Sequence, residues 1–433
     1  MRVLERVEAD ASFADIALEA ELRARGPSPR DAALATELVY GTLRWQRYLD
    51  WILSPHSRRR LDALDLRVRV ILRATAYQIA FLERVPAFAA VNDAVTLAPH
   101  TPGVKAFVNA VLRSFAHRGP SEREPAAPGD HLEALGTRCS FPTWLVARWV
   151  KRYGDDEAEA LMRAFNERPP LTLRTNTLRT TRGTLTQRLL FEEGLACRPT
   201  SLAPEGLVVS PGGAPGEWRA FADGSFAVQD EASMLVARLL APEPGSTVAD
   251  VCAAPGTKTT HLAQLMDDRG KVLAFDPQPA RLARVGEAAA RLGLTIIDAR
   301  DGGVEALASA FGRACDGVLV DAPCSNLGVL RRNPDVKWRR RPEDLVQVSR
   351  RQAEILAAAA TMVKPGGRLV YATCSLEPEE NDDVVRDFLA GHPGFAPDPP
   401  DTFPLPLDAD GTLRCLPHRD GTDGFTAVRF RLS

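Results

Sequence analysis

The chain has 433 residues, of which 45% are hydrophobic and 25% are charged, and its formal net charge is −2. This length accommodates two or three domains with separate cores, and the charge excludes a uniformly basic nucleic-acid-binding protein, so any such binding must use local patches. No apolar run approaches a membrane span, and residues 1–26 form a charged amphipathic pattern unlike a signal peptide. We therefore expect a cytoplasmic protein.

The first part of the chain has helical patterns and no convincing strand. Apolar residues recur at helical spacing, as in Leu34, Leu38 and Leu43, and prolines separate the segments. The expected helices are 12–25, 28–53, 61–82, 88–97 and 105–116. We predict an all-α bundle over residues 1–130.

Three consecutive arginines, Arg58, Arg59 and Arg60, lie in one turn of this bundle. A solvated charged face is the simpler interpretation of such a cluster. The alternative is a contact surface for an RNA backbone, which gains weight only if the rest of the chain acts on RNA.

A short polar segment and a small mixed region follow the bundle. Residues 119–129 are rich in proline and lack hydrophobic periodicity, which predicts a linker. Helical patterns at 142–153 and 157–165 and a strand from Leu171 then begin a small α+β segment over residues 139–226. Arg174 and Asn176, at and after that strand, could contact phosphates, although polar surface residues in a loop are commoner.

Helix and strand patterns alternate throughout residues 227–433. The expected strands are 247–251, 271–275, 294–298, 318–320 and 368–371, with a long helix at 344–363 between the last two. Such alternation predicts a doubly wound parallel sheet. Ligands of these sheets bind at the carboxyl ends of the strands.

The loop after the first of these strands consists of small residues. It contains Cys252, Ala253, Ala254, Pro255, Gly256, Thr257 and Lys258. Small side chains allow a ligand to approach the backbone, and the following helix start supplies amide donors. A phosphate-binding loop requires glycine where Thr257 precedes Lys258, and the GxGxxG dinucleotide fingerprint is absent. S-adenosylmethionine, which has no pyrophosphate, remains as the candidate ligand.

Acidic residues at the next strand ends could bind the rest of such a ligand. Asp276 ends the second strand, where a carboxylate can accept from both ribose hydroxyls. Capping of the helix that begins at Pro279 is an equally good explanation. Asp298 or Asp301 could accept from the adenine amino group, and we favour Asp301 because we expect it in the loop beyond the strand.

Two cysteines, Cys324 and Cys374, each follow a predicted strand and each precede a serine. The crossover helix makes the two strands neighbours, so both thiols would face one cleft. A thiolate that adds to carbon 6 of cytosine activates carbon 5 for methylation, and a second thiol could assist release. Asp321 could hold or protonate the ring at nitrogen 3. These residues alone leave open which thiol attacks, and a redox pair remains the alternative.

Several motifs carry a resemblance to a known family. DVCAAPGTKT, FDPQPARL, DAPCSNLGVLRRNPDVKW and YATCSLEPEEN resemble, in this order, the motifs of the RNA cytosine carbon-5 methyltransferases. YGTLRW and VNAVLRSF are similar to the NusB-like RNA-binding domain of the bacterial branch that modifies small-subunit ribosomal RNA. The resemblance implies that Cys374 attacks and that Cys324 acts in product release. It also implies that residues 252–258, Asp276, Asp301 and Asp321 line an S-adenosylmethionine site, with Thr257 where the family usually has glycine.

The combined expectation is a multidomain protein: an all-α NusB-like bundle, a small α+β segment and a Rossmann-like α/β methyltransferase domain. We expect a monomer without a metal that methylates ribosomal RNA. The expected RNA contacts are Arg58, Arg59, Arg60, Arg174, Asn176, Arg331 and Lys337. The alternatives are a transfer RNA methyltransferase with the same chemistry, and a noncatalytic RNA-binding or antitermination factor, for which Cys324, Cys374 and Asp321 would have no use.

Overall fold

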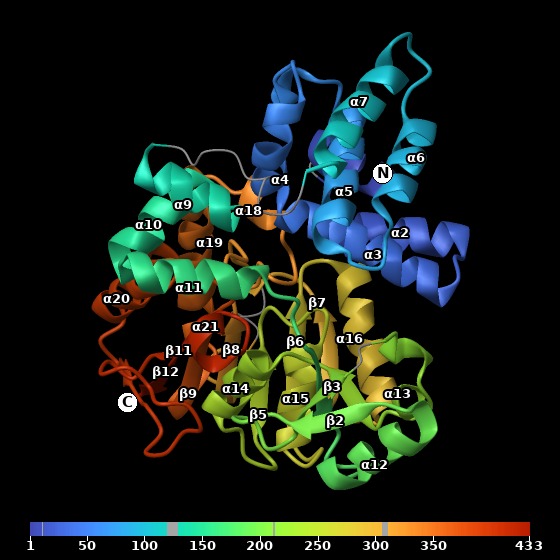
Figure 1. Ribbon diagram of the computed structural model, residues 1–433. Helices are drawn as coiled ribbons and strands as arrows, with labels where there is room; N and C mark the ends of the chain where they lie inside the picture. Colours follow the sequence, from blue (N-terminus) through green and yellow to red (C-terminus); the bar gives the residue numbers. More distant parts are fainter. Residues whose placement is uncertain (11, 119–128, 211–212, 305–310) are drawn as a thin grey trace. The chain divides into compact units, whose positions relative to one another are not determined.

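The computed structural model describes residues 1–10, 12–118, 129–210, 213–304 and 311–433, and its chain divides into two compact units (Figure 1). Unit 1 consists of Met1–Arg168 and Leu330–Arg340, and unit 2 of Pro169–Val329 and Arg341–Ser433. Nearly all of the expected linker at 119–129 lies outside the described residues. The division after Arg168 falls inside the segment expected at 139–226, so residues 139–168 lie in unit 1 and residues 169–226 lie in unit 2.

Unit 1 is built from helices. They are α1 (Arg2–Ala9), α2 (Ala14–Arg25), α3 (Pro29–Arg44), α4 (Gln46–Leu53), α5 (Leu66–Phe81), α6 (Ala87–Leu97), α7 (Val104–Ala116), α9 (His131–Cys139), α10 (Thr143–Tyr153) and α11 (Asp155–Asn166). Helices α3, α5 and α9 each begin at a residue whose side chain caps the helix. The Ser28 hydroxyl accepts from Asp31 N at 3.2 Å, which caps α3. The predicted single helix 28–53 is wrong, since Trp45 separates α3 from α4, and α1 and α9 were not predicted.

An ion-pair cluster around the buried Arg73 joins three helices of unit 1. Arg73 on α5 is 7% exposed, and its Nη2 lies 2.6 Å from Asp50 Oδ2 on α4. Its Nη1 lies 2.9 Å from Glu8 Oε2 on α1. Helices α4, α5 and α7 also pack through fully buried side chains such as Leu72 and Phe115. Helix α1, absent from the prediction, is therefore an integral part of the bundle.

The segment Leu330–Arg340, which continues the PCSN motif in sequence, belongs to unit 1. Lys337, on the short helix α18 (Val336–Arg339), donates through Nζ to Arg44 O at 2.8 Å. Arg44 Nη2 in turn donates to Arg331 O at 2.7 Å, and Trp338 Nε1 donates to Leu43 O at 2.6 Å. The end of α3 thus holds this segment by reciprocal hydrogen bonds.

Unit 2 begins with a four-stranded antiparallel sheet in the order β2-β3-β1-β4. Its elements are β1 (Leu171–Thr175), α12 (Arg182–Glu193), β2 (Ala196–Pro199), β3 (Gly206–Ser210), α13 (Arg219–Ala222) and β4 (Phe226–Val228). Leu173 of β1, Leu189 of α12 and Phe226 of β4 are fully buried in one cluster. The α+β character predicted for this segment is confirmed in its strand-bearing half.

The larger sheet of unit 2 has the order β10-β12-β9-β8-β5-β6-β7, and β11 pairs with β12. Its strands are β5 (Thr247–Asp250), β6 (Lys271–Asp276), β7 (Ile297–Asp301), β8 (Cys315–Asp321), β9 (Val363–Thr373), β10 (Phe395–Pro397), β11 (Leu413–Cys415) and β12 (Phe425–Leu432). The five strands from β9 to β7 are parallel, as predicted. The last three are antiparallel additions, with β12 beside β9.

Alternation along the parallel strands creates two cores on opposite faces of the sheet. On β8, Leu319 packs toward α14 (Glu231–Leu240) and α15 (Thr257–Leu265), whereas Val318 and Val320 pack on the opposite face. The second face is covered by α19 (Pro342–Ala360) and α20 (Asp382–Gly391) (Figure 1). Both faces are therefore covered, which explains the nearly continuous apolar run of a central strand.

Two expected elements have different limits. The strand predicted at 294–298 is displaced in the structure, where β7 spans Ile297–Asp301. Leu294 cannot begin it, because Leu294 N donates to Ala289 O at 2.9 Å and closes the end of α16 (Pro279–Leu292). The helix predicted to reach Val363 ends at Ala360, and β9 begins at Val363, which pairs with Cys315 before a register shift.

None of the helices in the described part of the chain combines the length and apolarity of a bilayer span.

Candidate functional site

Four predicted site residues lie at the carboxyl ends of parallel strands of unit 2, or directly beyond them. Asp276, Asp301 and Asp321 are the last residues of β6, β7 and β8, and Cys374 follows the end of β9. After β7 the chain returns to β8, on the other side of β5. The loops after β5 and β8 therefore flank a topological switch point, where ligands of such sheets bind.

The two thiols predicted to face one cleft are in contact. Cys324 Sγ lies 3.0 Å from Cys374 Sγ, and the two cysteines are not joined by a disulfide. Asn326 Oδ1 lies 2.9 Å from Cys374 Sγ and 3.4 Å from Cys324 Sγ, so it accepts from either thiol. Strands β8 and β9 are parallel neighbours with Asp321 opposite Ala372, which confirms the predicted crossover.

The contact between the thiols determines their electrostatics. The hydrogen bond with Cys324, followed by burial, raises the pKa of Cys374 well above its usual value of 9.0. Cys374 is therefore a neutral thiol at pH 7 in this structure. Cys324 is buried, whereas Cys374 keeps some exposed surface and is the more accessible of the two.

Asp321 has a cationic partner at the site. Lys258 Nζ donates to Asp321 Oδ2 at 2.7 Å and lies 4.8 Å from the centre of the Phe425 ring. Lys258 is buried, whereas the Asp321 side chain is 28% exposed. The pair links the loop after β5 to the end of β8, next to the thiols, with one carboxylate oxygen not bound to Lys258.

A buried acid organises the loop after β5. Asp250 Oδ2 accepts from Thr259 Oγ1 at 2.7 Å, and Ala253 N donates to Phe275 O at 2.8 Å. Burial raises the pKa of Asp250 to about 7. Gly256 has φ +103°, and a Cβ there would lie 3.0 Å from Val285 Cα, so only glycine fits without strain. The loop residues 252–258 thus pack closely at the start of α15.

The carboxylates of the neighbouring strands are placed as follows. Asp276 is buried, and its Oδ1 accepts from Gln278 N at 2.9 Å, so it stabilises the entry to α16. Asp301 is exposed at the end of β7, which corrects the expectation that it lies in a loop beyond the strand. Asp298 is within β7 and pairs with Arg300 and Lys271 at 2.7 and 3.1 Å. Asp301 is therefore more available than Asp298 to accept from a ligand. The reason is the ion pairing of Asp298, which the sequence did not indicate.

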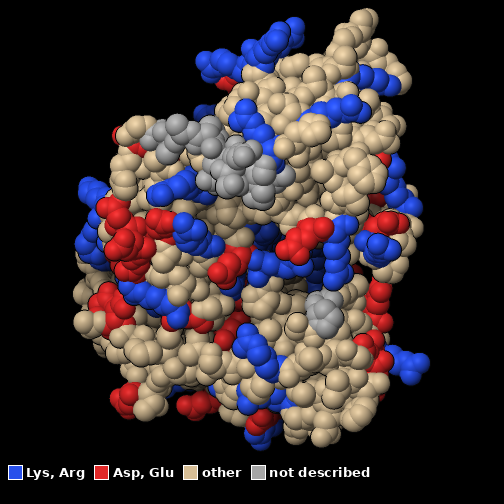
Figure 2. Space-filling model, viewed as in Figure 1, with Lys and Arg blue, Asp and Glu red and all other residues tan. Residues whose placement is uncertain are grey.

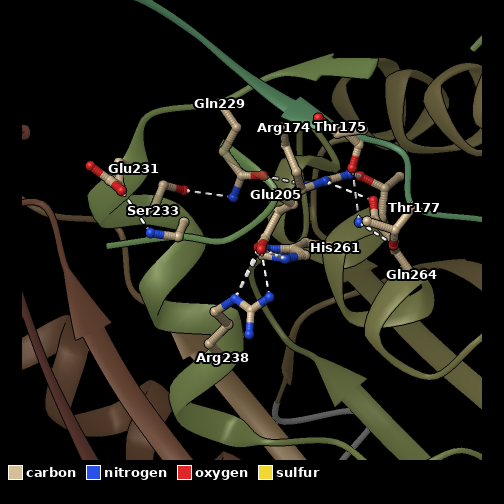
Figure 3. A network of polar contacts seen from close by, with 12 residues as sticks. Arg174, Thr175, Thr177, Glu205, Gln229, Glu231, Ser233, Arg238, His261 and Gln264 are labelled. Atoms are coloured by element: carbon tan, nitrogen blue, oxygen red, sulfur yellow. Dashed lines mark hydrogen bonds and ion pairs between the residues drawn. The ribbon is translucent and has the colours of Figure 1, made fainter. Parts of the chain in front are cut away.

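Arg174, predicted to contact RNA, is instead fully buried in unit 2 (Figure 3). Its guanidinium donates to Thr257 O at 2.7 Å and to Thr260 Oγ1 at 2.9 Å, both on α15. It also donates to Gln229 and to Gln264 Oε1, the latter at 3.1 Å. Arg174 thus fastens the four-stranded sheet to the helix that follows the loop 252–258. The predicted RNA contact by this side chain is wrong.

Burial also contradicts three further predicted RNA contacts. Asn176 Nδ2 donates to Gly224 O and Leu292 O, both at 2.9 Å. Arg331 and Lys337 are 4% and 1% exposed within unit 1. Charged residues are rarely buried without partners, and Lys337 is bound by Arg44 O and lies 3.9 Å from the centre of the Phe141 ring.

Arg58, Arg59 and Arg60 are exposed on unit 1, after the 3-10 turn that follows α4. Lys and Arg side chains gather over this end of α4 at the top of the face in Figure 2, where acidic and basic residues otherwise alternate. Arg60 Nη2 is bound by Asp62 Oδ2 at 2.6 Å. The RNA contact expected of this cluster remains a prediction.

Several residues around the thiols were not predicted. Beyond Asn326, they are Ser325, Gln352, Ser375 and Glu380, which form a buried hydrogen-bonded group behind the two cysteines. Three of them lie within the PCSN and TCSLEPEEN motifs, so the motifs contained the signal. Their mutual contacts depend on the pairing of β8 with β9 and could not be derived from spacing.

Comparison with known proteins gives consistent matches over the chain. The family model described as 16S rRNA methyltransferase RsmB/F matches residues 237–431, the NusB family model matches 1–117, and the RsmF/B-like ferredoxin-like domain model matches 141–213. A probable ribosomal RNA small subunit methyltransferase B of Bacillus subtilis is 37% identical, with 100% of this chain and 97% of that protein covered.

Two solved structures are also similar. The crystal structure of PH0851 has a TM-score of 0.83 at 29% identity and covers 99% of this chain and 97% of that one. NSun6 from Pyrococcus horikoshii, determined with the S-adenosylmethionine analogue SFG, has a TM-score of 0.61 at 25% identity. That match covers 67% of this chain and 98% of NSun6.

Proposed function

This chain belongs to the RsmB/F family of 16S rRNA methyltransferases, and we propose that it methylates carbon 5 of a cytosine in small-subunit ribosomal RNA through a covalent adduct of Cys374. The observation that carries the proposal is the pair of thiols in contact, 3.0 Å apart, at the switch point of the sheet. A methyltransferase that acts on an already nucleophilic atom needs no thiol there, whereas carbon 5 of cytosine requires prior attack at carbon 6.

S-adenosylmethionine is the cofactor of this family, and the residues at the switch point fit it. The small side chains of residues 252–256 leave the backbone approachable, and the exposed carboxylate of Asp301 can accept from an amino group. Asp276 Oδ2 and the Asp321 oxygen not bound to Lys258 are further acceptors. When bound, S-adenosylmethionine supplies an electrophilic methyl group.

Cys374 begins the reaction by losing its proton and bonding to carbon 6 of the cytosine. The carbon 5–carbon 6 double bond opens, and carbon 5 becomes nucleophilic. Because the thiol is neutral in this structure, its proton must leave as the substrate binds. Asp321 can act at nitrogen 3 as a protonated carboxyl group, which donates a hydrogen bond there as negative charge develops. Lys258 Nζ donates to Asp321 Oδ2 and fixes the side chain in place.

Release reverses the addition after methylation. The carbon 5 proton is removed, the carbon 5–carbon 6 double bond re-forms, and the sulfur–carbon 6 bond breaks. Cys324 Sγ lies at hydrogen-bonding distance of the sulfur that must leave, so we assign it to this step. For the base to reach Cys374, the target nucleotide must be unpaired or flipped out of its stack.

Transfer of a labelled methyl group to unmodified small-subunit ribosomal RNA, and separately to transfer RNA, tests this proposal. We expect label in ribosomal RNA, recovered as 5-methylcytosine and abolished by Cys374→Ala. Cys324→Ala should accumulate a covalent protein–RNA adduct. Cys197→Ala, on β2 outside the site, is the matched control and should behave like the parent.

The outcomes separate the alternatives. Label only in transfer RNA would keep the chemistry and change the substrate. Methylation at another position, insensitive to Cys374→Ala, would overturn the adduct mechanism. Absence of label in either RNA would favour the noncatalytic RNA-binding alternative.

A further inference from the structure

Glu380 is a buried carboxylate that contacts the residues following both cysteines. It ends the 3-10 turn Pro378–Glu380 and is 0% exposed. Its Oε1 accepts from Ser325 Oγ and from Ser375 Oγ, each at 2.5 Å. The two hydroxyl oxygens lie 3.1 Å apart. One carboxylate oxygen thus bridges the loop after β8 and the loop after β9.

The other carboxylate oxygen extends this bridge to a third element. Glu380 Oε2 accepts from Ser325 N at 2.8 Å and from Gln352 Nε2 on α19 at 3.0 Å. Gln352 Nε2 also donates to Pro323 O at 3.0 Å, immediately before Cys324. The cysteine of the β8 loop is therefore fixed on both sides, and the cysteine of the β9 loop through the serine that follows it.

We propose that Glu380 is a positioning residue that sets the separation of the two thiols, and that the steps assigned to Cys374 and Cys324 depend on it. The effect on catalysis rests on the proposed function, whereas the effect of Glu380 on the separation of the two thiols does not. A carboxylate only accepts hydrogen bonds, and here it faces four donor groups. In Glu380→Gln, an NH₂ group replaces one of the two carboxylate oxygens, so a hydrogen-bond donor would face the donors that this oxygen now accepts from.

Glu380 also has a contact that serves only to stabilise the turn, and this contact must be distinguished from the positioning role. The backbone oxygen of Glu380 accepts from the Tyr371 hydroxyl at 2.6 Å, and this contact does not involve the carboxylate. Glu380→Gln preserves that contact and the side-chain volume, and it changes only the bridge between the loops. If Glu380→Gln changes the reactivity of the two thiols and leaves the fold intact, the carboxylate has a positioning role.

The first readout is the geometry of the thiols without RNA. Diamide removes two electrons and two protons from the thiols to form a disulfide and is reduced to its hydrazine. The parent, Glu380→Gln, Glu380→Asp and Ser375→Ala are treated while folded, and the Cys324–Cys374 disulfide is followed by mass spectrometry. Glu231→Gln is the matched control, because its buried carboxylate binds Leu202 N and Ala203 N, both at 2.6 Å.

We expect Glu380→Gln to slow disulfide formation on the order of tenfold or more, since a small misplacement of reacting atoms has effects of that size. Glu380→Asp, which retains the acceptor, should recover part of the rate, and Ser375→Ala should fall between parent and Glu380→Gln. An unchanged rate in Glu380→Gln, or no disulfide in the parent, would overturn the inference. If Glu380→Gln does not fold, Ser375→Ala decides, because it removes one side of the bridge.

The second readout is methyl transfer to ribosomal RNA. Glu380→Gln should lower kcat on the order of tenfold, with KM for S-adenosylmethionine and for RNA within about twofold of the parent. A rise in KM alone would contradict a positioning role. The disulfide rate needs neither RNA nor cofactor, so it remains informative if the proposed function fails.

Discussion

Cys324 and Cys374 share a hydrogen bond of 3.0 Å between their sulfur atoms, and this bond is the largest cause of the raised pKa of Cys374. The nucleophile of the proposed reaction is thus held neutral by the residue assigned to release it. The contact between the two sulfur atoms therefore keeps the Cys374 thiol protonated in the RNA-free protein. In the proposed reaction Cys374 loses this proton only when the substrate is bound.

We predict that alkylation of Cys374 by iodoacetamide in the RNA-free protein is slow at pH 7 and accelerates as the pH rises, because only the thiolate reacts. Cys324→Ala removes the main cause of the raised pKa, so the rate profile of Cys374 should move to lower pH. Mass spectrometry of the modified peptide measures this, with Cys197 as an internal reference. A profile that stays in place would show that burial alone keeps Cys374 neutral.

Asp250 makes the stability of the protein depend on pH. Burial raises its pKa from 3.8 to about 7 in the folded state, so the folded protein binds more protons than the unfolded chain between these values. Stability from this group is complete below pH 3.8 and is lost as the pH rises toward 7. We therefore expect the free energy of unfolding of Asp250→Asn, relative to the parent, to improve from pH 5 to about pH 7 and to level off above that pH. Urea denaturation at each pH measures this, and a difference that is constant with pH would contradict it.

Arg174→Ala should lower the free energy of unfolding by about 3 kcal/mol or more, because it leaves several buried acceptors without a donor. RNA affinity per folded molecule, and its dependence on salt, should remain unchanged. Arg198→Ala, an exposed arginine on β2, is the control and should change stability by less than about 0.5 kcal/mol. A stable Arg174→Ala protein with a reduced salt slope would restore the RNA contact that burial contradicts.

The exposed arginine cluster should behave in the opposite way. Replacement of Arg58 and Arg59 by alanine should leave stability unchanged and weaken RNA binding, with the slope of log affinity against log salt reduced by about 1.5. Adding Arg60→Ala should contribute less, because Asp62 already binds that guanidinium. Arg23→Ala with Arg25→Ala, on α2 and paired with Glu19 and Glu21, is the matched control. An unchanged slope in the Arg58 and Arg59 variant would leave the cluster as a solvated face.

The sequence alone determined the parts of this protein that depend on local pattern. Apolar runs that end in Asp321 and before Cys374 predicted two strands, and the helical pattern between them predicted their parallel pairing, which β8 and β9 confirm. The position of Asp276 at the end of β6 followed in the same way. These features are local because a strand, its end and a crossover are specified by neighbouring residues.

Only the tertiary structure decided which polar residues are available to a substrate. Arg174 and Lys337 look like surface cations in sequence, yet Thr257 O binds one and Arg44 O the other, far along the chain. Glu380 likewise joins Ser325 to Ser375 only because β8 and β9 are neighbours. Burial of a charge depends on partners that supply its hydrogen bonds, and those partners are brought together by packing of distant segments rather than by sequence spacing.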